Sequence, residues 1–143
     1  MTPGVDSPFA TAALPSSLPE RRVDFTRPRV CLMGLPFDPI GLADAVDRIR
    51  EAAFAGRRCW VATPNLNFAI AARSDAAFRD SVLSSDLSLI DGMPLVWIAR
   101  LLGLPVRERV AGSDLFEALQ AHAGPPLAVY LFGGPPGVAA RAC

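Results

Sequence analysis

The sequence contains no lysine: all 14 of its basic residues are arginines, and 14 acidic residues bring the net charge to zero. The lack of lysine excludes Schiff-base chemistry and the lysine of a P-loop. His122 is the one histidine, which excludes a multi-histidine metal site and most Ser-His-Asp schemes. The balanced charge provides no positive field for nucleic acid, so we expect no nucleic-acid partner.

Cysteines are few, and their spacing does not suit a metal: Cys31, Cys59 and Cys143 form no CxxC pair. Cys31 and Cys59 lie in apolar, strand-like runs, so we expect both to be buried in a reducing compartment. No apolar run reaches the ~20 residues that span a bilayer. The N-terminus lacks the basic start and unbroken apolar core of a secretory signal. These absences together predict a cytoplasmic protein.

The composition divides the chain into two regions. Residues 1–28 hold many prolines among small residues without a sustained period, so we expect a disordered N-terminal tail. Residues 29–143 are expected to form one domain, and 51% hydrophobic residues in the chain suffice for a core. The chain ends within its last expected helix, which leaves the sheet without its next strand. We therefore expect a domain truncated at its C-terminus.

Apolar runs alternate with helical periods along residues 29–143. Strands are expected at residues 29–35, 59–63, 86–90 and 127–132, with residues 106–110 as a further extended segment. Helices are expected at residues 42–53, 68–73, 75–83, 94–102 and 114–123, and a last one after residue 137. This alternation predicts an α/β fold: a Rossmann-like parallel sheet with flanking helices.

Local signals also predict helix ends and core residues. Asp75 and Ser113 are expected N-caps, and Gly56 is an expected C-terminal stop. His122, late in its helix, is expected to serve the helix end rather than chemistry. Trp60 and Trp97 are expected to lie in the core.

Asp91 stands at the carboxyl end of the run 86–90, where Gly92 lets the backbone turn and Pro94 suits a first helical turn. The carboxyl ends of parallel strands share one edge of the sheet, where open α/β folds bind ligands. This position makes Asp91 a candidate general base. Two alternatives remain open: Asp91 caps the following helix, or it forms an ion pair with Arg109.

Other polar residues follow predicted strands and are expected at the same edge. Thr63 and Asn65 supply hydroxyl and amide groups suited to a sugar or an oxyanion, and turn chemistry around Pro64 is the alternative. Arg109 offers a planar fork for phosphate or carboxylate. From the residues alone, a solvated surface run is the favoured reading of 107–109.

A glycine-rich turn follows the last expected strand, with Gly133, Gly134 and Gly137 among prolines. Its exposed amides suit a diphosphate at the start of a helix, and simple turn geometry is the alternative. The sequence has no Asp-x-Asp pair for a divalent metal. A bound nucleotide sugar would therefore depend on arginine, amides and helix ends to balance its diphosphate.

Four motifs together resemble the WecG/TagA/CpsF family of bacterial glycosyltransferases, from about Val30 to the end. They occur in family order and at family-like spacing, and they are Thr63-Pro64-Asn65, Leu87-Ser88-Leu89-Ile90-Asp91-Gly92, Glu108-Arg109-Val110-Ala111-Gly112-Ser113-Asp114-Leu115 and Leu131-Phe132-Gly133-Gly134-Pro135-Pro136-Gly137-Val138-Ala139.

The resemblance implies a Rossmann-like fold and inverting transfer from a UDP-sugar without metal or cofactor. Typical members move N-acetylmannosamine onto lipid-diphosphate-linked N-acetylglucosamine in teichoic acid or enterobacterial common antigen assembly, and others move different hexoses in capsule or exopolysaccharide synthesis. By motif, Asp91 matches the base that deprotonates the acceptor hydroxyl, Thr63 and Asn65 match pocket residues, and Arg109 matches the pocket arginine. The glycine turn matches the approach to the donor.

Family members continue past the glycine turn into more of the core and a C-terminal appendage that closes the site, carries further arginines and touches the membrane. Peripheral contact with the inner face of the plasma membrane is therefore expected of a full-length protein only. Alternatives are an inactive, truncated nucleotide-sugar-binding fragment, a nucleotide-binding module and a Rossmann-like oxidoreductase. A homo-oligomer also stays open.

Overall fold

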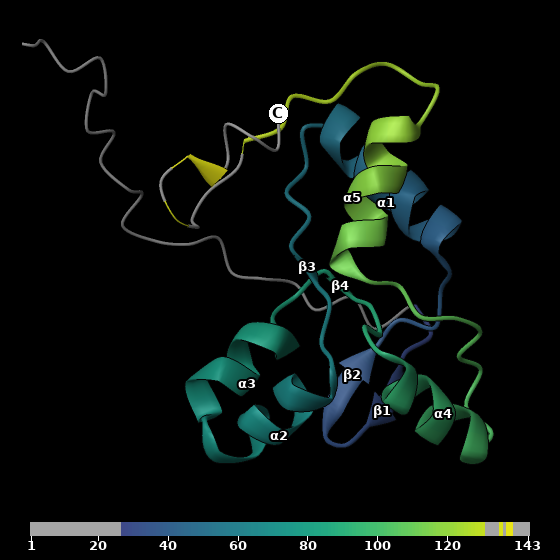
Figure 1. The fold of residues 1–143 in the computed structure, drawn as a ribbon, viewed down its shortest axis with the longest axis vertical. Helices are drawn as coiled ribbons and strands as arrows, with labels where there is room; N and C mark the ends of the chain where they lie inside the picture. Colours follow the sequence, from purple (N-terminus) through teal and green to yellow (C-terminus); the bar gives the residue numbers. More distant parts are fainter. Residues whose placement is uncertain (1–26, 131–134, 136, 139–143) are drawn as a thin grey trace, which may run out of the picture.

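The structure is a computed structural model that describes residues 27–130, 135, 137 and 138 (Figure 1). In chain order its elements are β1 (Val30–Leu32), β2 (Leu35–Phe37), α1 (Leu42–Phe54), β3 (Val61–Ala62), α2 (Leu66–Ser74), α3 (Ala76–Leu83), β4 (Leu87–Ser88), α4 (Met93–Leu101) and α5 (Gly112–Ala121). Helices therefore dominate the described part of the chain, and short strands connect them.

The run at 29–35 is not one strand: it contains β1, a turn and the first residue of β2. β1 and β2 pair antiparallel, with Val30 opposite Phe37. Met33 and Gly34 form the turn with φ angles of 52° and 83°. Positive φ at both central residues is typical of a type I′ hairpin turn, and glycine adopts it without strain. The prediction of a parallel first strand is therefore wrong.

β3 and β4 form the parallel pair that an α/β fold predicts. The hydrogen bonds continue past the strand ends: Leu89 N–H donates to Ala62 O at 2.8 Å, and Asp91 N–H donates to Pro64 O at 3.0 Å. Since both strands run the same way, their carboxyl ends lie together. The α/β class is confirmed, with strands shorter than predicted.

The wider Rossmann-like sheet stays a prediction, because the sheets within the described residues are β1–β2 and β3–β4. Residues 106–110 and 127–130 are not in strands. Val110 N–H nevertheless donates to Ile90 O at 2.8 Å, so the chain before α5 runs beside the continuation of β4.

The five expected helices before residue 124 are confirmed within a few residues at each end. The Asp75 side chain accepts from Phe78 N–H at 2.9 Å at the start of α3, and Gly56 with φ of 62° follows α1. Ser113 is not the cap of α5. The N-cap is Ala111, which offers no side-chain acceptor, and Ser113 lies inside the helix.

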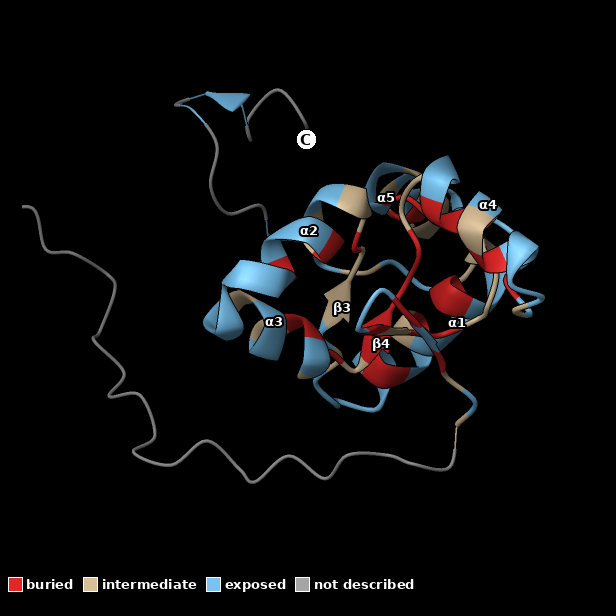
Figure 2. Cartoon of the chain, turned by 90° about the horizontal axis from the view of Figure 1, so that it is seen from below, coloured by how far each residue is buried: buried red, intermediate tan, exposed pale blue. Residues whose placement is uncertain are grey.

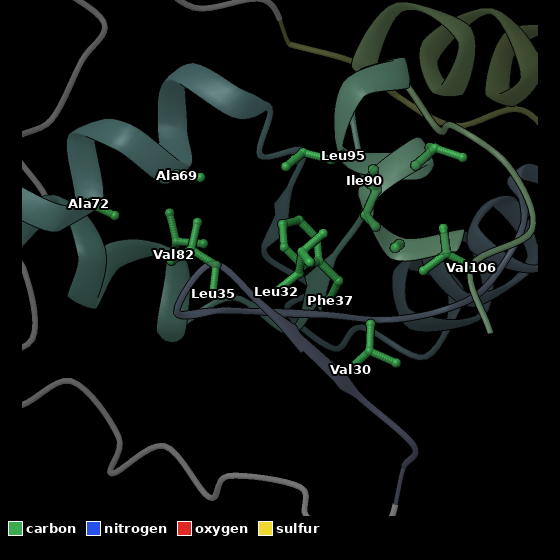
Figure 3. Close-up of a cluster of buried hydrophobic side chains, with 12 residues drawn as sticks. Val30, Leu32, Leu35, Phe37, Ala69, Ala72, Val82, Ile90, Leu95 and Val106 are labelled. Atoms are coloured by element: carbon green, nitrogen blue, oxygen red, sulfur yellow. The ribbon is translucent and has the colours of Figure 1, made fainter. Parts of the chain in front are cut away.

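Two apolar cores meet the extended chain that follows β4. The larger packs the hairpin against α2, α3 and α4 and includes Phe37 and Ile90 (Figure 3). The smaller joins α1 and α5, which lie side by side in Figure 1, and includes Leu89 and Val110. Successive strand side chains point to opposite faces, so Leu89 and Ile90 enter different cores. Both cores thus fix the strand that leads to Asp91.

Three residues expected in the interior lie at the surface instead. Trp60 is 45% exposed and Trp97 61% exposed, and Cys31 is exposed as well. Trp97 stands with Met93 and Leu101 on the outer side of α4, while the inner side packs on the larger core, as the buried colouring of Figure 2 shows. Within the part of the chain that the structure describes, no helix is long and apolar enough to cross a membrane.

Candidate active site

Two loops and the chain before α5 meet beyond the carboxyl ends of β3 and β4. The bond from Asp91 N–H to Pro64 O joins the loop after β4 to the loop after β3. The bond from Val110 N–H to Ile90 O joins the third segment to the same edge. Residues far apart in the sequence are therefore neighbours where the strands end.

The glycines of this region mark close approaches between the segments. A Cβ placed on Gly112, the first residue of α5, would lie 3.5 Å from Thr63 Oγ1. A Cβ placed on Gly92 would lie 3.8 Å from Asn65 Cβ. Thr63 therefore faces the start of α5, and Asn65 lies beside the turn that follows Asp91.

Asp91 and Arg109 form an ion pair, with Arg109 Nη1 3.8 Å from Asp91 Oδ1. Arg109 Nη2 also donates to Asp114 Oδ2 at 2.5 Å. The side chains of Asp91 and Arg109 are 29% and 39% exposed, so a ligand can reach both. Of the alternatives for Asp91, the ion pair is confirmed and the helix cap is wrong, because Gly92 occupies the N-cap of α4 without a side-chain bond.

Arg109 therefore has partners and is not part of a purely solvated run. Its neighbour Glu108 reaches back to α1 and accepts from Leu42 N–H at 2.6 Å. This bond holds the chain on one side of Arg109, and the Val110 bond holds it on the other. The backbone that presents the Arg109 guanidinium is thus fixed at both neighbouring residues.

Asn65 is the N-cap of α2, and its Oδ1 accepts from Phe68 N–H at 3.2 Å. The turn alternative for this residue is thereby confirmed, as far as its carbonyl oxygen is concerned. The side-chain amide nitrogen takes no part in that bond, and it remains a donor suited to a ligand. Thr63 is half-buried beside Gly112 and carries the hydroxyl predicted for the same edge.

The N-termini of α4 and α5 both begin at this edge. Gly92, with φ of 121°, and Ala111 are their N-caps, and neither provides a side-chain acceptor. The first N–H groups of a helix lack intrahelical partners and carry a partial positive charge. Together with the Arg109 guanidinium, the two helix ends place N–H donors that suit an anion at this edge, beside the carboxylates of Asp91 and Asp114.

The glycine turn lies mostly outside the described residues, because Gly133 and Gly134 are not described. Gly137 is described, exposed and has φ of 82°, which glycine adopts without strain. Its contact with a diphosphate stays a prediction. Among the residues that the structure covers, no three His, Cys, Asp or Glu side chains gather as ligands for a metal ion.

Asp38 follows β2 directly, and its carboxylate is only 3% exposed. The sequence gives little indication that this residue is buried among polar partners. Its Oδ1 lies 3.3 Å from Arg27 Nε and 3.6 Å from Arg29 Nε, and its Oδ2 accepts from Ser88 N–H at 2.8 Å. Burial raises the pKa of the Asp38 carboxyl, while the Ser88 bond and the nearby arginines oppose that rise. Asp38-Pro39 resembles an ordinary turn, so only the fold shows what it contacts.

His122 is the C-cap of α5, as expected, and its Nδ1 accepts from Gly124 N–H at 3.0 Å. Asp47 Oδ1 lies 3.9 Å from the other ring nitrogen. The first contact belongs to the end of α5, and the second joins that end to α1. His122 thus has the structural role that its position predicts.

Comparison with known proteins finds a matching family and a relative. The model of the family described as glycosyl transferase WecG/TagA/CpsF matches residues 30–143. An N-acetylglucosaminyldiphosphoundecaprenol N-acetyl-beta-D-mannosaminyltransferase from Bacillus spizizenii is 32% identical over 60 residues. That match covers 42% of this chain and 23% of the Bacillus protein, so the chain aligns with less than a quarter of that relative.

Proposed function

Since this chain belongs to the WecG/TagA/CpsF family of glycosyl transferases, we propose that it transfers a hexose or an N-acetylhexosamine from a UDP-sugar to a sugar carried on polyprenyl diphosphate. The name of the Bacillus relative supports both substrates in part: it specifies an N-acetylmannosaminyl group and a lipid-diphosphate-linked N-acetylglucosamine. The product would enter a cell-surface polysaccharide.

One observation carries the proposal: an accessible carboxylate, Asp91, stands beside Arg109 at an edge where two helices begin. Glycosyl transfer needs a base for the acceptor hydroxyl and positive charge for the leaving diphosphate. Asp91 would be the base and Arg109 the positive charge, and the two form one ion pair. The 3.8 Å between Arg109 Nη1 and Asp91 Oδ1 is an ion-pair distance beyond hydrogen-bond range, so the oxygens of the carboxylate have room for an acceptor hydroxyl.

The proposed reaction is a direct displacement. The acceptor hydroxyl gives its proton to a carboxylate oxygen of Asp91 while its oxygen attacks the anomeric carbon of the donor. The bond from that carbon to the diphosphate oxygen breaks, and UDP leaves with the electron pair. Attack from the face opposite to UDP inverts the configuration at the anomeric carbon.

Arg109 and the N-termini of α4 and α5 are proposed to stabilise the charge on the leaving diphosphate. The guanidinium fork matches phosphate oxygens, and backbone N–H groups at a helix start add to it. The Asn65 amide and the Thr63 hydroxyl are proposed to hold hydroxyls of the transferred sugar. The glycine turn with Gly133, Gly134 and Gly137 is proposed to approach the donor diphosphate.

A lipid-linked acceptor places the reaction at a membrane surface. We therefore propose that the protein works from the cytoplasm in peripheral contact with the inner face of the plasma membrane. Light scattering measures the mass of the protein in solution and so distinguishes a monomer from a homo-oligomer.

The test is a transfer assay with the purified protein, a panel of UDP-sugars and a short-chain polyprenyl-diphosphate N-acetylglucosamine. We expect one donor of the panel to be consumed with release of UDP, and NMR of the product to show an inverted anomeric centre. A retained centre would contradict the single displacement. Donor binding by calorimetry without any transfer would contradict the enzyme function and support a module that only binds nucleotide sugars.

A further inference from the structure

Asp38 binds both backbone polar groups of Ser88, the last residue of β4. Asp38 N–H donates to Ser88 O at 2.7 Å, and Ser88 N–H donates to Asp38 Oδ2 at 2.8 Å. A neighbouring strand would satisfy the same two groups, so one aspartate replaces a strand at this point. β4 is thereby bonded to β3 along one edge and to the residue after β2 along the other.

The second carboxylate oxygen connects Asp38 to two arginines. Arg27 Nε and Arg29 Nε lie 3.3 and 3.6 Å from Asp38 Oδ1, and Arg29 Nη2 donates to Ser85 O at 3.3 Å. The side chains of the two arginines are 15% and 21% exposed. The cluster of Asp38, Arg27, Arg29, Ser85 and Ser88, here termed the Asp38 clamp, therefore holds β4 both at its end and just before its start.

The backbone from Ser88 to Asp91 is short and bonded at each step. Leu89 N–H is bonded to β3 at Ala62 O, Ile90 O accepts from Val110 N–H, and Asp91 N–H donates to the loop after β3. A shift of β4 at Ser88 therefore moves Asp91 and, through the Val110 bond, the segment that carries Arg109. The clamp and the ion pair are parts of one hydrogen-bonded stretch of chain.

We propose that Asp38 is a positioning residue for the transfer reaction: through its bonds to Ser88 together with its ion pairs to Arg27 and Arg29 it fixes the carboxyl end of β4, and so fixes where the Asp91 carboxylate meets the acceptor. This proposal rests on the proposed role of Asp91. A displacement of about 1 Å at a reacting group can lower a rate by about 10²-fold. Loss of the clamp should therefore lower kcat about 10- to 100-fold.

Asp38→Asn is the sharpest variant, because it keeps the size of the side chain and one acceptor for Ser88 N–H while it presents an amide to Arg27 and Arg29. Asp80→Asn is the matched control. Asp80 is an exposed aspartate on α3, with a side chain 68% exposed and 3.9 Å from Arg79. Both variants make the same chemical change, and only one of them touches β4.

The first readout is amide hydrogen exchange, measured below the melting temperature of each variant. We expect the amides of Ser88, Leu89 and Asp91 to exchange at least about 10-fold faster in Asp38→Asn, and amides of α3 to keep their parent rates. Unchanged exchange at these three amides would overturn the proposal. This readout needs no activity, so it tests the clamp even where the parent protein transfers no sugar.

The second readout is the division between kcat and KM. We expect Asp38→Asn to lower kcat while the KM for the donor stays within about two-fold, and Asp80→Asn to change neither. A purely structural Asp38 would lower the melting temperature and leave kcat per folded molecule at the parent value, which would overturn the proposal. Should Asp38→Asn not fold, Arg27→Gln leaves both Ser88 bonds in place and must accelerate exchange at the same amides.

Discussion

Alanine at position 41 should destabilise the protein through Glu108, a residue far along the chain. Gly41 is the N-cap of α1, and the first N–H of that helix, on Leu42, donates to Glu108 Oε1 at 2.6 Å. A Cβ on Gly41 would overlap that same oxygen. The φ of Gly41 is −88°, which any residue adopts, so the expected cost arises from the displaced carboxylate and not from the backbone.

The size of the effect follows from the lost cap. Removing a side-chain cap costs about 1 kcal/mol, and a carboxylate at a helix N-terminus adds about 0.3 kcal/mol where it is exposed, as Glu108 is. Gly41→Ala and Glu108→Ala should therefore each lower the free energy of unfolding by about 1 to 1.5 kcal/mol. Both changes remove the same bond, so the double variant should lose about as much as either single variant.

A double-mutant cycle tests this coupling. Urea denaturation gives the free energy of unfolding of the parent, the two single variants and the double variant. We expect a coupling free energy of about 1 kcal/mol between positions 41 and 108. Gly56→Ala is the control, since Gly56 has φ of 62° and open space around it, and its cost should add to that of Glu108→Ala. Additive costs for Gly41→Ala and Glu108→Ala would refute the contact.

Two further outcomes follow from the structure. Burial, followed by the charge of a nearby aspartate, raises the pKa of the Cys59 thiol, so iodoacetamide at neutral pH should label the exposed Cys31 before Cys59, as peptide mass mapping would show. Faster labelling of Cys59 would argue against its burial. Gly92→Ala should cost about 1 to 3 kcal/mol from backbone strain alone, because φ is 121° and the nearest atoms to a Cβ lie 3.8 Å away; an unchanged urea midpoint would be inconsistent with that conformation.

The helices could be predicted because their signals are local. The apolar stripe of α1, the Asp75 cap of α3 and the Gly56 stop each depend on residues within a few positions of one another. The hairpin was missed because the side chains from Val30 to Met33 are all apolar and show no alternation. Gly34 was the one sign of a turn inside that run.

The exposed face of α4 could not be identified from periodicity. Leu95 and Val96 are buried while Met93, Trp97 and Leu101 are exposed, so apolar residues surround the helix. A helix that is apolar on all sides carries no stripe that marks its inner face. Only the packing of α4 against the hairpin decides which side is covered.

The neighbourhood of Asp91 could be predicted in part, because the carboxyl ends of parallel strands must lie together. That rule brings Thr63 and Asn65 close to Asp91 whatever the length of the strands. The same rule does not predict the contact of Asp38. Its contact at Ser88 joins the end of a hairpin to a parallel strand, and no sequence period links these two positions.

The central claim is that the Asp91 carboxylate takes the proton of the acceptor hydroxyl. Asp91→Asn tests it most directly, because the amide keeps the size of the side chain beside Arg109 and cannot act as the base. We expect the transfer rate to fall about 10²- to 10⁴-fold while calorimetry shows donor binding within about two-fold of the parent. Asp80→Asn should transfer at the parent rate. Transfer by Asp91→Asn near that rate would contradict the account.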